Sequence, residues 1–148
     1  MVLCWHPGSQ AGASKDSTAR SELTVRLSPE EFATLVEEAL ADIPPGLAHY
    51  LKDVVVDVEP MPDRQTCRSV GVRDRTELLG LYLGTPLTER GLNTDSMMAD
   101  RIVIYQRNIE RLCRSRAEII EQVRTTVFHE VGHHFGLSEE DLEALGYE

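Results

Sequence analysis

The stretch from Ser115 to Gly136 constrains the fold of this chain more than any other feature. At about 100° per residue, its side chains separate into an apolar face and a polar face. The apolar face holds Ile120, Val123, Val127, Val131 and Phe135, and the polar face holds Glu118, Gln122, Thr126, His129 and His133. The pattern predicts a helix, beginning near Asn108 or after a break near Ser115, that packs on a sheet and turns both histidines away from the core. Gly136 is suited to the C′ position where such a helix ends.

Three segments upstream predict the strands of that sheet. Residues 53–59, 77–84 and 100–107 are rich in β-branched and aliphatic side chains. Residues 60–76 are expected to form a loop because they contain proline, glycine and many charged side chains, and residues 85–99 a polar loop that could rim a cleft. The predicted fold class is therefore α+β, with a short mixed sheet of about three strands packed on the long helix.

The N-terminal part of the chain contains one clear helix signal. Ser28 and Glu31 form a capping box around Pro29, and the helix must end before Pro44. A short helical piece is expected at residues 46–51. Residues 1–22 have no periodicity and are expected to be a flexible tail. This division leaves residues 23–148 as a single domain.

Charge and cysteine content narrow the function classes. The net charge of −10 argues against nucleic acid as a partner, and the arginines between Arg101 and Arg124 are interpreted as a solvated face. The chain has an odd number of widely spaced cysteines: Cys4, Cys67 and Cys113. This pattern is typical of reduced thiols in the cytoplasm. No apolar run approaches the length of a membrane span, so no membrane partner is expected.

His129 and His133 lie one helical turn apart, which places their Cβ atoms about 5–6 Å from each other. Neutral imidazole is a preferred ligand of zinc, and a catalytic zinc site combines three protein ligands with a water. The spacing predicts one Zn²⁺ per chain. Glu130 is rotated to the side of the histidine face, where its carboxylate would reach the water as general base. The alternative is a helix with two exposed histidines and no metal.

The third metal ligand is expected just beyond the helix. Gly136 lets the chain turn, and Glu139 lies ten residues after His129. Glu140 and Asp141 are alternatives. All three acids have another explanation, because carboxylates in the first turn of a helix are favoured by its dipole.

Other polar residues are interpreted as structural. His134 points about 100° away from His133, toward the packed side, and is expected to be a partly buried, hydrogen-bonded histidine. Ser138 is expected to cap a last short helix. The remaining candidates, each interpreted as a packing or surface residue, are the histidines His6 and His49 and the possible oxyanion stabilisers Tyr82, Tyr105 and Tyr147.

The string "HEVGHHFGLSE" resembles the HExxHxxGxxD-type signature of the small bacterial zincin-like metallopeptidases, sometimes called minimal zincins. "GLYLGTPLTER" and "DRIVIYQRNIE" are similar to upstream blocks of that family, and the resemblance covers residues 28–148. It implies a small domain with a short sheet on the active-site helix, His129 and His133 as ligands, and Glu130 as catalytic glutamate. Glu139 stands where the family usually has aspartate, which lengthens this ligand by one methylene.

These observations predict a zinc-dependent metallopeptidase that acts on a peptide or protein substrate. Two alternatives remain: a zinc-binding scaffold that regulates or binds partners with little proteolysis, and a metal hydrolase that is not a protease. A substrate peptide is expected to lie extended along an edge strand. Residues 100–107 are the candidate edge because they directly precede the metal-binding helix in sequence.

Overall fold

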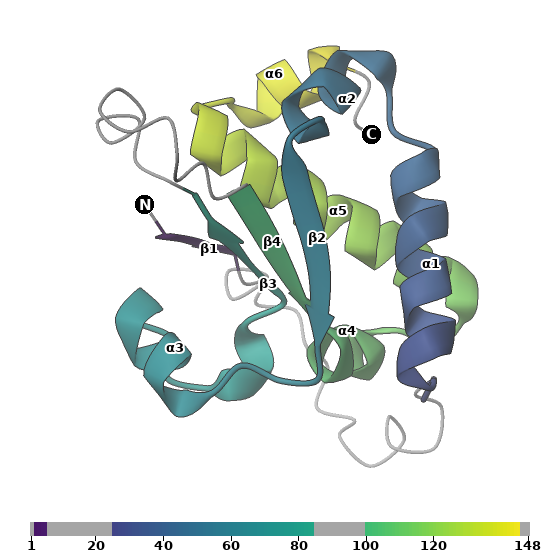
Figure 1. The fold of residues 1–148 in the computed structure, drawn as a ribbon, viewed down its shortest axis with the longest axis vertical. Coiled ribbons are helices and arrows are strands. Elements are labelled where there is room, and N and C mark those ends of the chain that lie inside the picture. The colour runs from purple at the N-terminus through teal and green to yellow at the C-terminus, as the bar shows by residue number, and fades with distance from the viewer. Residues whose placement is uncertain (1, 6–24, 85–99, 146–148) are drawn as a thin grey trace.

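The computed structural model describes residues 2–5, 25–84 and 100–145 of the 148-residue chain (Figure 1). The elements in chain order are β1 (Val2–Trp5), α1 (Pro29–Ala41), α2 (Pro45–Leu51), β2 (Val54–Glu59), α3 (Arg64–Val70), the 3₁₀ turn η1 (Arg75–Glu77), β3 (Gly80–Leu83), β4 (Asp100–Tyr105), α4 (Gln106–Leu112), α5 (Arg116–Phe135) and α6 (Glu139–Ala144). None of the helices in the described part has the length and apolar character that crossing a membrane requires.

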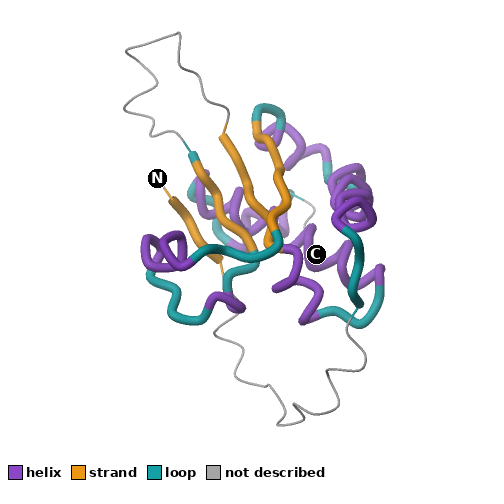
Figure 2. The backbone as a smooth tube through the Cα atoms, turned by 60° about the horizontal axis from the view of Figure 1, so that its bottom comes forward, coloured by secondary structure: helices purple, strands orange, loops and turns teal. Residues whose placement is uncertain are grey.

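The strands form one mixed sheet in the order β1-β3-β4-β2 (Figure 2). β2 and β4 are parallel, and β3 pairs antiparallel with β4 on one side and with β1 on the other. The α+β class and the mixed sheet are as predicted, and the three expected strands correspond to β2, β3 and β4. The additional strand, β1, comes from the segment expected to be a tail. Residues 6–22 and the expected loop 85–99 lie outside the described residues.

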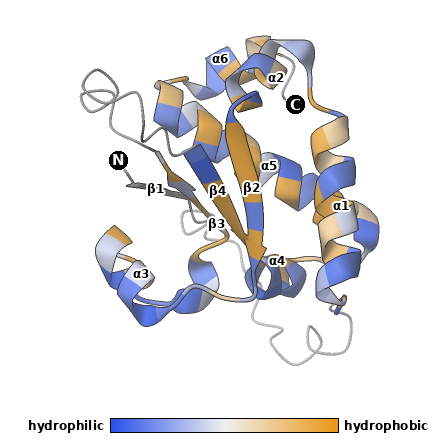
Figure 3. Cartoon of the chain, viewed as in Figure 1, coloured by the Kyte–Doolittle hydropathy of each residue, from blue (hydrophilic) through white to orange (hydrophobic). Residues whose placement is uncertain are grey.

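Alternate residues of the two inner strands face two separate cores. Tyr82, Ile102 and Ile104 pack in the main core with side chains of α1 and α5. Leu81 and Val103 point to the other face, where they pack with Cys67 of α3 in a smaller core. This alternation follows from the two-residue repeat of a strand. In Figure 3, β2 is largely hydrophobic, whereas the more peripheral α3 is largely hydrophilic.

Helix α1 has the predicted N-terminus. The Ser28 Oγ accepts a hydrogen bond from the Glu31 amide at 3.1 Å, and the Ser28 amide donates to the Glu31 carboxylate at 2.9 Å. The helix ends at Ala41, before Pro44. Its buried face packs beside α5 in the main core and closes that side of the sheet (Figure 1).

Two expectations about the helices and strands are wrong. Residues 60–76 contain helix α3, because Asp63 caps its first turn by accepting from the Thr66 amide at 2.6 Å, and Gly71 ends it with φ 75°. Residues 100–107 are not an edge strand: β4 lies between β3 and β2, and the edges are β1 and β2. The apolar run of β4 is typical of an inner strand with both faces covered.

Candidate metal and catalytic site on helix α5

Helix α5 begins and ends at residues suited to those positions. Ser115 accepts from the Glu118 amide at 3.2 Å, and Gly136 ends the helix with φ 68°, in the left-handed region that glycine tolerates. The helical conformation is interrupted at Cys113, between α4 and α5. The prediction of a helix that begins near Ser115 after a break is therefore confirmed.

Two glycines let α5 lie close to β3. A Cβ on Gly80 would come within 2.6 Å of the Thr126 Cγ2, and a Cβ on Gly84 within 2.7 Å of the His134 ring. Between them, the Tyr82 amide contacts Glu130. Two residues along the strand and four along the helix cover nearly the same length, about 6–7 Å. The strand and the helix therefore run side by side in a regular register.

The helix has three sides rather than the two expected. Val123, Val127 and Val131 face the main core with α1. A second side, with Thr126, Glu130 and His134, faces β3. The third is open, with His129 half-buried and His133 exposed. Thr126 is thus buried although it was expected on the outward face, and Phe135 is 42% exposed although it was expected in the core. Thr126 is buried because β3 covers part of the polar face of the helix.

The two candidate ligand histidines are neighbours on the open side. Their ring centroids are 6.4 Å apart. Burial lowers the pKa of His129, the Glu139 charge opposes that shift, and the proximity of His133 adds to it. A lowered pKa favours the neutral imidazole, which is the form that binds a metal ion.

Glu130 is 1% exposed and lies against β3. Its Oε2 accepts a hydrogen bond from the Tyr82 amide at 3.2 Å. This hydrogen bond holds the Glu130 carboxylate against β3. Glu130 directly follows His129 in the helix. Glu130 is therefore buried against β3, to one side of the histidine face, with its side chain shielded from bulk solvent.

The three candidate third ligands lie at the start of α6 and differ in their environments. Asp141 closes a capping box, in which its Oδ2 accepts from the Ser138 amide at 2.8 Å, and this hydrogen bond lowers its pKa. Glu139 is exposed, and its charge acts on His129. No three histidine, cysteine, aspartate or glutamate side chains in the described segments lie close enough together to hold a metal ion. The structure thus brings His129 and His133 together without placing the third ligand.

A buried polar cluster beside the site was not found from sequence. The His134 ring stacks on Tyr82 at 4.0 Å between centroids, and the Tyr82 hydroxyl donates to the Asp100 Oδ2 at 2.8 Å. The His134 Nε2 lies 3.8 Å from the same oxygen. His134 is partly buried, as predicted, and Tyr82 is fully buried as a packing residue. No sequence pattern pairs Asp100 with residues that lie so far along the chain.

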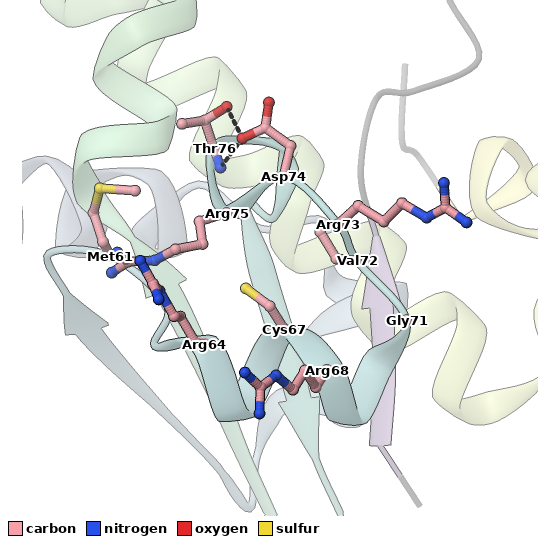
Figure 4. Close-up of a pocket in the computed structure, with 10 residues that line it drawn as sticks. All are labelled: Met61, Arg64, Cys67, Arg68, Gly71, Val72, Arg73, Asp74, Arg75 and Thr76. Carbon is pink, nitrogen blue, oxygen red and sulfur yellow. Dashed lines mark hydrogen bonds between the residues drawn. The ribbon is translucent and has the colours of Figure 1, made fainter.

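The other polar candidates lie away from this cluster. Tyr105 is buried in the smaller core, and His49 is exposed on α2. His6 and Tyr147 lie outside the described residues. A pocket of about 880 Å³ lies near α3 and contains no histidine (Figure 4). Four of its lining residues are arginines: Arg64, Arg68, Arg73 and Arg75.

The set of donors at the open side of α5, of which the structure brings only His129 and His133 together, is of the chemical kind that zinc accepts. It offers two imidazoles on one helix face, a lowered pKa at His129, and a glutamate whose charge reaches that histidine. Nitrogen and carboxylate ligands of this kind are those that zinc prefers in catalytic sites.

Comparison with known proteins gives one finding about the family. No curated protein matches this chain. The family profile described as zincin-like metallopeptidase matches residues 51–147, more than half of the chain, and this region contains β2, β3, β4 and all of α5. The chain therefore belongs to the zincin-like metallopeptidase family.

Proposed function

We propose that this protein is a zinc-dependent metallopeptidase that binds one Zn²⁺ per chain and hydrolyses peptide bonds. The observation that carries the proposal is the placement of His129 and His133 on the open side of α5, with Glu130 directly beside them. The two imidazoles and the Glu139 carboxylate would hold the metal. Bound zinc would polarise the scissile carbonyl and acidify a water molecule.

The role of Glu130 in this proposal is proton transfer. Its carboxylate would accept a proton from the attacking water and then give it to the nitrogen of the leaving amine. The hydrogen bond from the Tyr82 amide orients the carboxylate for this task.

The second candidate is a zincin scaffold that binds zinc and regulates or recruits partners with little proteolysis. The burial of Glu130 favours it, because a general base that is 1% exposed has no access to a substrate in this conformation. The two candidates share the metal ligands and differ in whether Glu130 takes part in turnover.

The test combines metal content with turnover. We expect stoichiometric zinc in the parent and loss of zinc in His129→Ala and His133→Ala. The matched control is His49→Ala, which replaces an exposed histidine on another helix and should retain zinc. Glu130→Gln should retain zinc but lose cleavage of denatured proteins and peptide libraries, because an amide does not accept the proton. Retention of zinc by the double histidine variant would refute the metal site. Equal cleavage by Glu130→Gln would refute the general base.

The third ligand is tested by a chelator competition. Glu139→Gln should weaken zinc binding at least tenfold, or about 1.4 kcal/mol, because an amide lacks the negative charge that binds the metal. Glu140→Gln is the matched control and should change the affinity little. A large loss in Glu140→Gln or Asp141→Asn instead would assign the ligand to that residue.

The proposed partner is a peptide or protein rather than nucleic acid. Two arginines of the run between Arg101 and Arg124 are paired with acids, in the contacts of Arg101 with Asp57 at 2.7 Å and of Arg107 with Glu110 at 2.9 Å. The proposed location is the cytoplasm. Cys67 and Cys113 support it, since both are buried free thiols.

A further inference from the structure

The outer edge of β3 is the part of the sheet nearest to Glu130. Leu79 accepts a hydrogen bond from the Tyr105 amide on the β4 side. Because backbone groups alternate in direction along a strand, Gly80 and Tyr82 turn theirs to the opposite edge. The Tyr82 amide that donates to Glu130 therefore lies on the edge of β3 that pairs with β1.

The histidine side of α5 faces the same edge. His129 and His133 lie roughly 160° around the helix from Val127 and Val131, which pack toward α1. The β3-facing side of the helix lies between these two directions. The open side of α5 is thus turned away from β4 and β2 and toward β1, which lies next to both α5 and β3 (Figure 1).

β1 occupies this edge in the form of an extended peptide. Its four residues pair antiparallel with β3, with Leu3 opposite Tyr82 and Trp5 opposite Gly80. An extended peptide bound to a sheet edge makes the same main-chain hydrogen bonds. Such a peptide, placed where β1 lies, would pass directly beside Glu130.

We propose that β1 is an autoinhibitory strand that occupies the substrate edge of the site, and that its release opens β3 to an extended peptide. This inference rests on the proposed peptidase function for the identity of the peptide. Glu130 is almost fully buried in the present conformation, beside the edge of β3 that β1 occupies. It also replaces the prediction that a peptide would pair with β4, whose two edges are both occupied.

Two proline substitutions in the full-length chain separate pairing from other effects. Leu3 lies opposite Tyr82, and by the same alternation its amide points toward β3, so Leu3→Pro removes a donor to β3. Cys4 lies opposite Leu81 in the alternate pair, and its amide points away from β3. Cys4→Pro is therefore the matched control, since proline is tolerated on the outer side of an edge strand.

The measurement is fluorescence anisotropy with a labelled peptide that copies residues 1–8 with serine in place of Cys4. We expect Leu3→Pro to bind this peptide at least tenfold more tightly than the parent, because the internal competitor is weakened, and Cys4→Pro to bind like the parent. Equal affinity of the two proline variants would overturn the inference.

A disulfide lock gives a second, independent measurement. Val2 and Leu83 form a non-hydrogen-bonded pair, in which Cα atoms lie about 4.5 Å apart, within the range of a disulfide. The oxidised Val2→Cys/Leu83→Cys protein should bind the peptide at least tenfold more weakly than the same protein after reduction. Unchanged affinity upon reduction would overturn the inference even if Leu3→Pro does not fold.

Cleavage assays distinguish this inference from the proposed function. If zinc-loaded Leu3→Pro binds the peptide tightly but cleaves nothing, the peptidase proposal fails and the autoinhibitory strand stands. If the parent, Leu3→Pro and the oxidised lock all cleave peptides at one rate, the peptidase proposal stands and the autoinhibitory strand fails.

Discussion

The side of α5 that faces α1 and the side that faces β3 are both buried, yet they are built differently. The α1 side is purely aliphatic, with Val123, Val127 and Val131 in the main core. The β3 side buries Glu130 and Thr126, and glycines at Gly80 and Gly84 allow the helix to approach the strand closely. The first side depends on buried apolar area, whereas the second depends on close backbone approach and on particular hydrogen bonds. Helix α5 thus has one buried side that stabilises the fold and another that positions polar groups of the candidate site.

The largest expected effect is on the α1 side. Phe32 of α1 is fully buried in the main core, so Phe32→Ala should lower the free energy of unfolding by about 3–5 kcal/mol. Urea denaturation measures this change. The matched control is Phe135→Ala, the same substitution at a residue that is 42% exposed, and it should cost much less. Equal costs would mean that Phe135 belongs to the core, as its position in the sequence pattern predicted.

A smaller effect is expected on the β3 side. The Cβ of Gly80→Ala would lie 2.6 Å from the Thr126 Cγ2 and 3.3 Å from the Val103 carbonyl oxygen. Such overpacking should cost about 1–3 kcal/mol. Thr126→Ser in the same protein removes the Cγ2 and should restore part of the loss in thermal denaturation. If the double variant is no more stable than Gly80→Ala, close approach to Thr126 is not the cause.

The smallest effect, over the interval from pH 8 to pH 10, is a pH dependence from Cys113, which packs in the main core. Burial raises the pKa of its thiol to about 12, from an ordinary value of 9.0. The folded state therefore retains a proton that the unfolded state loses above about pH 9. The stabilisation is complete below that pH and declines as pH rises toward 12, by about 1.4 kcal/mol per pH unit. Denaturation of the parent and of Cys113→Ala at pH 8 and pH 10 measures the difference. Identical pH dependence in both proteins would contradict it.

Most of the helices could be predicted because their signals are local. Ser28, Glu31 and Pro29 lie within a few residues of one another, and the same is true of the residues that end α5 at Gly136. Helix α3 was missed for a related reason. It buries only Cys67, so it has no apolar repeat, although Asp63 and Gly71 carry capping signals at its ends.

The candidate site also has contacts that could be predicted from the sequence and contacts that could not. The spacing of His129 and His133 brings them together through the geometry of one helix, and the position of Glu130 beside them follows from the same repeat. The stack of His134 on Tyr82 and the contact of Tyr82 with Asp100 join three segments that have no common pattern. Contacts of this kind depend on how α5 lies on the sheet.

The sequence by itself determined that α5 forms, where it begins and ends, and that its two histidines share a face, because a helix repeats every few residues. Only the tertiary structure decided that β4 is an inner strand, that β3 covers Glu130, and that β1 lies at the edge beside the histidines. Strand order depends on hydrogen bonds between residues far apart in the chain. The alternation within a strand specifies which faces are buried, but it does not specify the neighbours.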